Sequence, residues 1–230
     1  SGNGKLTIFD RDNIEYSNFQ RQTLYTENDA HEALPKVIAA KNRLIQIRND
    51  VVIEAWIEHV DYPFLEQHGK EVDLILDATD NFDTRQLIND FAYKHHIPWI
   101  YGGVVQSTYA EATFIPEQTP CFNCLMPQLP SVNLTCDTVG VIQPAVTMTT
   151  SLQLKDALKL LTGHDIKPQL TYGDIWEGDH YRIGFSKMHQ DQCPTCGSRP
   201  HFPYLNQERQ NYATLCGRDT VQYKNKNISQ

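Results

Sequence analysis

The sequence predicts an α/β protein in which a mostly parallel sheet is continued by an antiparallel section. Three observations support this fold class. Short apolar runs alternate with helical patterns in the N-terminal part, closely spaced strand patterns begin after Ser107, and four cysteines form two C-x-x-C pairs. Strands that alternate with helices favour a parallel sheet, because parallel strands need long crossover connections.

The strands expected in the N-terminal part are short runs of apolar or β-branched residues. They are Lys5–Phe9, Val51–Ile57, Asp73–Asp77 and Trp99–Val105. Apolar residues at helical spacing predict helices at Lys36–Arg48 and Phe82–His95, and the second of these helices is followed by Pro98. Residues 1–105 are therefore expected to form an α/β half of the domain.

The remaining elements belong to residues 106–222, which we expect to form a metal-stapled half of the same domain. In chain order they are a strand at Thr108–Ile115, a loop at Ser131–Asp137, a helix at Val146–Leu161, and a hairpin of Gln169–Trp176 with Tyr181–Ser186. The long helix is expected to stop at Gly163. Residues 223–230 form a polar tail.

Composition is that of an ordinary soluble protein. The chain has 230 residues, of which 40% are hydrophobic and 21% are charged, and its net charge is −8. That negative charge argues against nucleic acid or an anionic membrane as the main partner. No apolar run approaches the length of a membrane span, no signal peptide begins the chain, and the cysteine usage fits a reducing cytoplasm.

The two cysteine pairs, Cys121/Cys124 and Cys193/Cys196, have the spacing of zinc knuckles. Four thiolates around one Zn²⁺ form a closed tetrahedron, so such a site would be structural and would join two distant parts of the chain. Two disulfides or a redox-active pair would use the same residues. Turn residues in both pairs favour zinc over these alternatives.

Polar residues follow the first expected strand. Asp10 ends the strand, where a carboxylate can bind ribose hydroxyls in nucleotide-binding folds, although a turn residue is the simpler interpretation. Asn18, Gln20 and Arg21 then lie within four residues, and an arginine can clamp phosphate oxygens. A solvated helix face would explain them equally well. Lys36 follows a proline at a helix start, where the helix dipole favours phosphate.

A second polar segment, D-A-T-D-N-F-D-T-R, follows the strand that ends at Asp77. It lies at the carboxyl end of a parallel strand, where α/β folds place their ligands. Asp80 could hold Mg²⁺ on a triphosphate, and Asn81 could bond a leaving phosphate. Either residue could instead cap the helix that begins near Asp83, and the two roles are compatible.

Together these strings resemble the ThiF/MoeB/HesA family, which is related to ubiquitin-activating enzyme. The resemblance rests on S-N-F-Q-R-Q, on D-N-F-D-T-R and on the two cysteine knuckles. It implies a Rossmann-like fold, a homodimer, and an enzyme that uses Mg-ATP to adenylylate the C-terminal Gly-Gly carboxylate of a ubiquitin-like sulfur carrier. The carrier would be MoaD-like or ThiS-like, and a likeness to MoeB-type members favours molybdopterin synthesis over thiamine thiazole synthesis.

The resemblance also implies roles for individual residues. Asp10 would bind ribose, while Ser17, Asn18, Arg21 and Lys36 would bind phosphates; Asp80 would bind Mg²⁺, with Asn81 beside it. Arg21 and Asp80 would thus act in catalysis. Cys136 matches a position where some members carry a cysteine for sulfur transfer, although it could be a bystander, and Cys216 is expected to be structural.

The chain departs from the family pattern at its start, since no G-x-G-x-x-G is present. We therefore expect that the N-terminal part of the nucleotide fold, with its first strand and glycine-rich loop, is missing. Two other functions compete with adenylylation. One is a non-catalytic scaffold that binds the carrier without ATP chemistry. The other is a nicotinamide dehydrogenase, which the phosphate-type cluster and the cysteine knuckles argue against.

Overall fold

The computed structural model describes residues 4–126, 140–205, 212–214 and 221–223. The chain divides into two compact units, Ser1–Val60 and Asp61–Gln230. Within the described ranges, no helix has both the length and the apolar character needed to cross a membrane.

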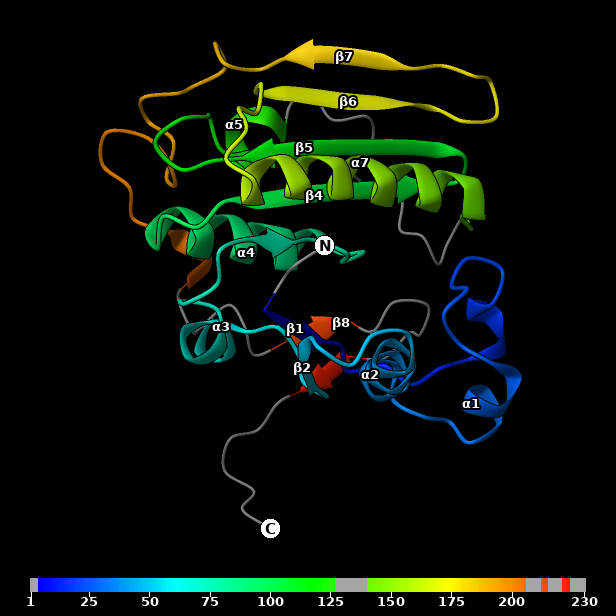
Figure 1. The fold of residues 1–230 in the computed structure, drawn as a ribbon. Helices are drawn as coiled ribbons and strands as arrows, with labels where there is room; N and C mark the ends of the chain where they lie inside the picture. Colours follow the sequence, from blue (N-terminus) through cyan, green and yellow to red (C-terminus); the bar gives the residue numbers. More distant parts are fainter. Residues whose placement is uncertain (1–3, 127–139, 206–211, 215–220, 224–230) are drawn as a thin grey trace. The chain divides into compact units, whose positions relative to one another are not determined.

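The first unit contains two parallel strands with helical segments between them (Figure 1). Its elements are β1 (Lys5–Phe9), η1 (Tyr16–Asn18), α1 (Glu27–His31), α2 (Lys36–Ile47) and β2 (Val52–Trp56). β1 pairs with β2 in parallel, in the register Ile8 to Ala55. A small core of Ile14, Ala30 and Ala39 packs the connecting segment onto α2. Both strands and α2 confirm the sequence predictions, whereas η1 and α1 were not predicted.

The second unit contains a five-stranded mixed sheet with the order β3-β4-β5-β6-β7. The strands are β3 (Ile75–Leu76), β4 (Trp99–Val105), β5 (Thr108–Phe114), β6 (Gln169–Asp174) and β7 (Tyr181–Gly184). β3 and β4 are parallel, and every later pair is antiparallel. The predicted change from parallel to antiparallel pairing after Ser107 is therefore confirmed. β4 and β5 are neighbours, so the expected boundary after residue 105 lies inside one sheet.

Helices cover both faces of this sheet because its strands alternate between two apolar sides. Trp99, Ala112 and Phe114 face a core that also includes α4 (Phe82–Lys94) and α5 (Phe122–Leu125). α7 (Gln143–Leu161) lies along β4 and β5 on the other face, as Figure 1 shows. Gly163, with φ of +73°, follows the end of α7 at the predicted stop.

Several short elements of the second unit were not predicted, because they carry too few residues for a periodic pattern. They are α3 (Tyr62–His68), α5, η3 (Pro203–Leu205), β8 (Tyr212–Thr214) and β9 (Val221–Tyr223), and the last two pair as a separate antiparallel ribbon. The predicted loop Ser131–Asp137, with Cys136, lies outside the described residues, as do Cys216 and all of the predicted tail after Tyr223.

Candidate functional site

The carboxylate of Asp10, which follows β1, stabilises the turn in which Asp10 itself lies. Asp10 Oδ1 accepts a hydrogen bond from the backbone N–H of Asp12 at 2.8 Å. Tyr25 lies close enough for the Asp10 carboxylate to affect its hydroxyl electrostatically. Burial and, after it, the negative charge of Asp10 raise the pKa of the Tyr25 hydroxyl to about 12. Tyr25 is thus a neighbour of the expected ribose ligand that the sequence pattern did not single out.

Lys36 occupies the predicted start of α2 and is tied to the same turn. Its backbone N–H donates to Asp12 O at 2.9 Å, and its Nζ lies 3.2 Å from Asp12 Oδ2. The Lys36 side chain is 12% exposed, whereas that of Asp12 is 55% exposed. A cation at a helix N-terminus is unfavourable for the dipole but suits an anionic ligand.

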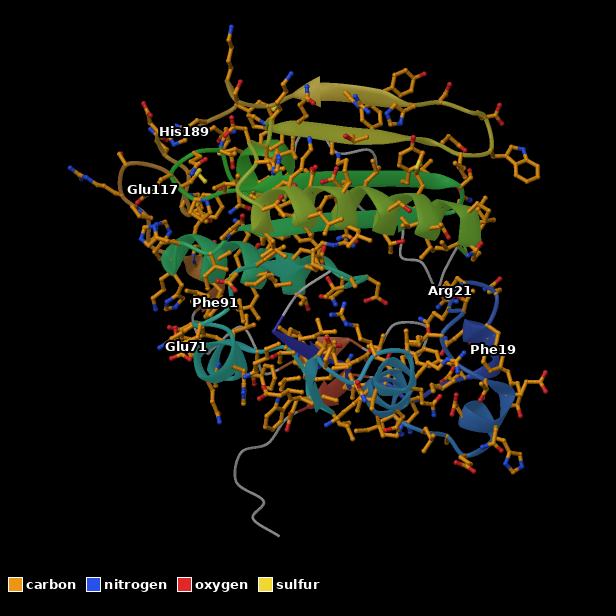
Figure 2. The ribbon with its side chains drawn as sticks, in the orientation of Figure 1. Phe19, Arg21, Glu71, Phe91, Glu117 and His189 are labelled. Carbon is orange, nitrogen blue, oxygen red and sulfur yellow. The ribbon has the colours of Figure 1, made fainter. Side chains whose placement is uncertain are left out.

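Ser17, Asn18 and Arg21 come together in and after η1, on the segment that carries the labelled Phe19 and Arg21 in Figure 2. Asn18 is buried, and its Oδ1 accepts from the Glu15 N–H at 3.0 Å. The Arg21 N–H donates to Asn18 O at 3.0 Å and Arg21 Nη1 donates to Ser17 O at 3.3 Å. The Asn18 oxygen therefore stabilises the turn that presents Ser17 and Arg21.

Asp80 and Asn81 lie in the second unit, between β3 and α4. Asn81 is the N-cap of α4, and its Oδ1 accepts from the Thr84 N–H at 2.8 Å. The sequence allowed either residue to be the cap, and the structure selects Asn81. Asp80 is exposed, which leaves its carboxylate accessible to a ligand.

The four knuckle cysteines converge in the second unit. Their Sγ atoms all lie within 4.8 Å of one another, with 3.4 Å between Cys121 and Cys193 and 3.6 Å between Cys124 and Cys196. These distances exceed the roughly 2.05 Å of a disulfide, and all four are free thiols. Around a metal with Zn–S bonds of about 2.3 Å, tetrahedral sulfurs would be about 3.8 Å apart. The cluster could therefore hold a metal ion.

Two adjacent residues in the middle of α4 support the two knuckles, and the sequence pattern did not indicate either one. Asn89 Oδ1 accepts from the Phe122 N–H at 3.0 Å in the first knuckle. Asp90 accepts from Thr195 Oγ1 at 2.5 Å and from the Tyr204 N–H at 2.9 Å. Both side chains belong to residues with 0% exposure. Side chains of α4 therefore hold the segments that carry the two cysteine pairs.

A third polar cluster joins β5 to α7. Thr113 Oγ1 donates to Glu111 Oε1 at 3.2 Å and lies 3.0 Å from Asp156 Oδ2. Glu111 is 1% exposed. Burial and, after it, the adjacent Asp156 carboxylate raise the pKa of the Glu111 carboxyl to about 8. No motif in the sequence indicated this pair.

The structure therefore gathers the expected ligands into separate local groups. Asp10 and Lys36 are linked through Asp12, Ser17 and Arg21 share a turn around Asn18, and Asp80 adjoins Asn81. The roles assigned to these residues stay predictions, because their positions alone do not test ligand binding.

Sequence relatives and solved structures support the expected family. The chain is 42% identical to the sulfur carrier protein ThiS adenylyltransferase of Bacillus subtilis, covering 97% of this chain and 67% of that protein. It is 32% identical to the molybdopterin-synthase adenylyltransferase of Escherichia coli, over 85% of this chain and 77% of the relative. The relatives are named adenylyltransferases, as the resemblance implied.

The fold is similar to that of E. coli MccB, solved in complex with ATP, with a TM-score of 0.71 and 19% identity. That match covers 84% of this chain but only 59% of the MccB chain. A family model described as "ThiF family" matches residues 1–196. On this match, and on the 42% identity to the Bacillus subtilis protein, the chain belongs to the ThiF family.

Proposed function

We propose that the complete protein adenylylates the C-terminal Gly-Gly carboxylate of a small ubiquitin-like sulfur carrier, using Mg-ATP. The observation that carries the proposal is membership of the ThiF family together with relatives named as adenylyltransferases of sulfur carriers. The polar groups of the chain suit this chemistry, because they include cations and an exposed carboxylate.

The proposed reaction needs little acid–base catalysis. A carboxylate oxygen of the carrier attacks the α-phosphorus of ATP, the bond to the β-phosphate breaks, and pyrophosphate leaves with the electron pair. Because the nucleophile is already an anion, catalysis consists of positioning and charge neutralisation. Mg²⁺ would supply part of that neutralisation when bound.

We assign the predicted roles to the residues as follows. Asp10 binds ribose, Asp80 binds Mg²⁺ and Asn81 lies beside it; phosphates are bound by Ser17, Asn18, Arg21 and Lys36. The exposure of Asp80 supports its role as a Mg²⁺ ligand. The role of Lys36 is supported by its partner Asp12, whose carboxylate is 55% exposed, so that a phosphate can replace it. The buried oxygen of Asn18 is used by the turn, so this residue would bind phosphate through its amide nitrogen.

The carrier is MoaD-like or ThiS-like. The likeness to MoeB-type members favoured the molybdopterin carrier. The higher identity to the Bacillus subtilis relative, 42% against 32% for the molybdopterin-synthase adenylyltransferase, favours the ThiS-like carrier instead. We propose the thiazole pathway as the first to test.

ATP–pyrophosphate exchange measured with each carrier tests the activity. We expect exchange with one Gly-Gly carrier and none with a carrier that lacks the terminal glycine. Arg21→Ala and Asp80→Ala should each abolish exchange in a folded protein. The matched controls are Arg43→Ala and Asp83→Ala, an exposed arginine of α2 and an exposed aspartate of α4, and they should keep it. Binding of a carrier without any exchange would favour the scaffold alternative.

We propose further that the cysteine cluster binds one structural Zn²⁺. Four sulfur ligands at near-tetrahedral spacing suit zinc and leave no open position for catalysis. The support from Asn89 and Asp90 is what a metal site needs, because outer-shell hydrogen bonds orient the ligands. Metal analysis should find about one zinc per chain.

We also propose a homodimer. Leu154, Leu158 and Leu161 are spaced along α7 and are 54%, 41% and 43% exposed, which is more apolar helix surface than a solvated face needs. Sedimentation of the complete protein at micromolar concentration should give a dimer. A monomer would contradict the proposal.

For Cys136 we propose a role in sulfur transfer. Adenylylation uses no thiol, so Cys136→Ala should keep pyrophosphate exchange and lose downstream sulfur transfer. Loss of exchange in a folded Cys136→Ala protein would place the thiol in the adenylylation site. Retention of both activities would make it a bystander.

A further inference from the structure

The loop between β3 and α4 is fixed on both sides of Asp80. Before it, the N–H and Oγ1 of Thr79 both donate to Asp77 Oδ1, at 2.8 and 2.7 Å. After it, Asn81 caps α4 through the Thr84 N–H. Thr79 and Asn81, the residues on either side of Asp80, are thus both held by hydrogen bonds, while the Asp80 carboxylate is exposed.

Arg85 reaches this loop from the first turns of α4. Its Nε donates to Asp77 Oδ2 at 3.0 Å, and its Nη2 donates to Thr79 O at 2.5 Å and to Gly102 O at 3.0 Å. The guanidinium also lies 5.0 Å from the ring centroid of Tyr101. One side chain therefore joins the loop, the end of β3 and the middle of β4.

α7 holds the start of the same loop. Gln153 Nε2 donates to Asp77 O at 2.7 Å and to Ile100 O at 3.3 Å. A Cβ atom at position 102 would lie only 2.6 Å from that nitrogen, so a larger residue there would displace the Gln153 amide. Arg85 and Gln153 therefore attach the loop to β4 and to α7.

We propose that Arg85 is a positioning residue for Asp80, acting through Asp77 and the Thr79 carbonyl. The proposal rests on the function proposed above, in which Asp80 binds Mg²⁺. The peptide bond whose oxygen Arg85 holds is the one that joins Thr79 to Asp80, so Arg85 fixes the backbone from which the ligand extends. Only a planar guanidinium can bond these separate acceptors while it stacks on a ring.

Amide hydrogen exchange of the peptide spanning residues 77–85 tests the positioning, whether or not the protein is active. In Arg85→Lys, which keeps the charge but loses the fork, exchange at residues 77–81 should rise about 10-fold or more. Arg199→Lys is the matched control at an exposed arginine and should leave exchange unchanged. Asp80→Ala should also leave it unchanged, because the contact of the Asp80 carboxylate with Asn81 Nδ2, at 3.5 Å, is too long to hold the loop. Unchanged exchange in Arg85→Lys would overturn the proposal.

The Mg²⁺ dependence of pyrophosphate exchange tests the link to Asp80. In Arg85→Lys the Mg²⁺ concentration for half-maximal rate should rise roughly 10- to 100-fold, the usual effect of losing a supporting group. The KM for the carrier should change much less. A faster-exchanging loop with an unchanged Mg²⁺ dependence would overturn the link. A wild-type protein inactive with both carriers would reject the proposed function, and the hydrogen exchange would still decide the role of Arg85.

A second variant covers the case in which Arg85→Lys does not fold. Asp77→Asn combined with Arg85→Gln removes both buried charges at once, so neither is left unpaired. The shorter amide cannot span Thr79 O and Gly102 O. This double variant should fold and show the same faster exchange at residues 77–81; protection equal to wild type would overturn the proposal.

Discussion

Lys36 in the first unit and Arg85 in the second each pair with a carboxylate that follows a β-strand, but their environments differ. The Lys36–Asp12 pair spans 3.2 Å and its carboxylate is 55% exposed, whereas the Arg85–Asp77 pair spans 3.0 Å and its carboxylate is 0% exposed. A hydrated carboxylate can release its cation to a phosphate at little cost. An enclosed one cannot, because separation would leave a buried charge unpaired. The difference indicates a ligand-exchangeable pair and a fixed structural pair.

The largest effect is expected at the cysteine cluster of the second unit, where three of the four cysteines are buried. Cys121→Ser should lose the metal and destabilise the second unit by more than about 3 kcal/mol, since metal binding to structural sites contributes roughly 10 kcal/mol or more. Metal analysis and hydrogen exchange would measure both effects. A chelator applied to the wild type should reproduce them. Full metal content in the variant, or equal loss of protection in both units, would contradict this expectation.

The fixed pair should respond strongly to the loss of one partner. Asp77→Ala should lower the free energy of unfolding by roughly 3–5 kcal/mol, because it leaves the Arg85 cation unpaired in a mostly buried position. Asp12→Ala is the matched change in the exchangeable pair and should cost less than about 1 kcal/mol. Urea denaturation of both variants measures the contrast. Similar losses in the two variants would remove the distinction between the pairs.

The buried carboxyl of Glu111, which lies beside a second carboxyl, sharpens the comparison through its pH dependence. The pKa of Glu111 is about 8 in the folded protein against an ordinary value of 4.5, so the folded state binds more protons between these values. Stability should therefore fall as pH rises from about 4.5 to about 8, by a few kcal/mol. Glu111→Gln should flatten this slope and stabilise the protein at pH 8 relative to wild type. Thermal unfolding across the range measures it, and parallel curves would contradict it.

The sequence predicted the long elements and the ligand types, because both depend on local pattern. β1, β4 and α4 were located within a residue, and the two C-x-x-C spacings indicated the cysteine cluster. Helix α5 has only four residues, too few to show a period. The supporting groups were not predicted for a different reason. Asp90 and Thr195 are distant in the chain, and only tertiary packing shows that they meet.

The same reasoning explains why the anchor of Asp80 was missed. In the sequence, Arg85 is one member of a family string, and its partners Thr79 and Gly102 are not distinguished from other polar or small residues. Three acceptors, two on the loop after β3 and one on β4, become one binding set only when β3, β4 and α4 pack together. Local pattern therefore led to the proposed ligand residues, and the fold shows which side chains contact the loop that carries Asp80.

The smallest expected effect tests the exchangeable pair directly. Asp12→Asn removes the carboxylate that competes for the Lys36 ammonium, but it keeps the backbone carbonyl that accepts from the Lys36 N–H. If phosphate replaces Asp12 when ATP binds, the variant should bind ATP about 2- to 5-fold more tightly, or less than about 1 kcal/mol. The gain should shrink at high salt, because salt screens the exposed Asp12 carboxylate whose competition the variant removes. Lys36→Met, which keeps most of the apolar stem, should lose ATP affinity with little change in stability. Calorimetric titration of both variants measures the effect, and weaker ATP binding by Asp12→Asn would show that the Lys36–Asp12 pair is itself a fixed part of the site.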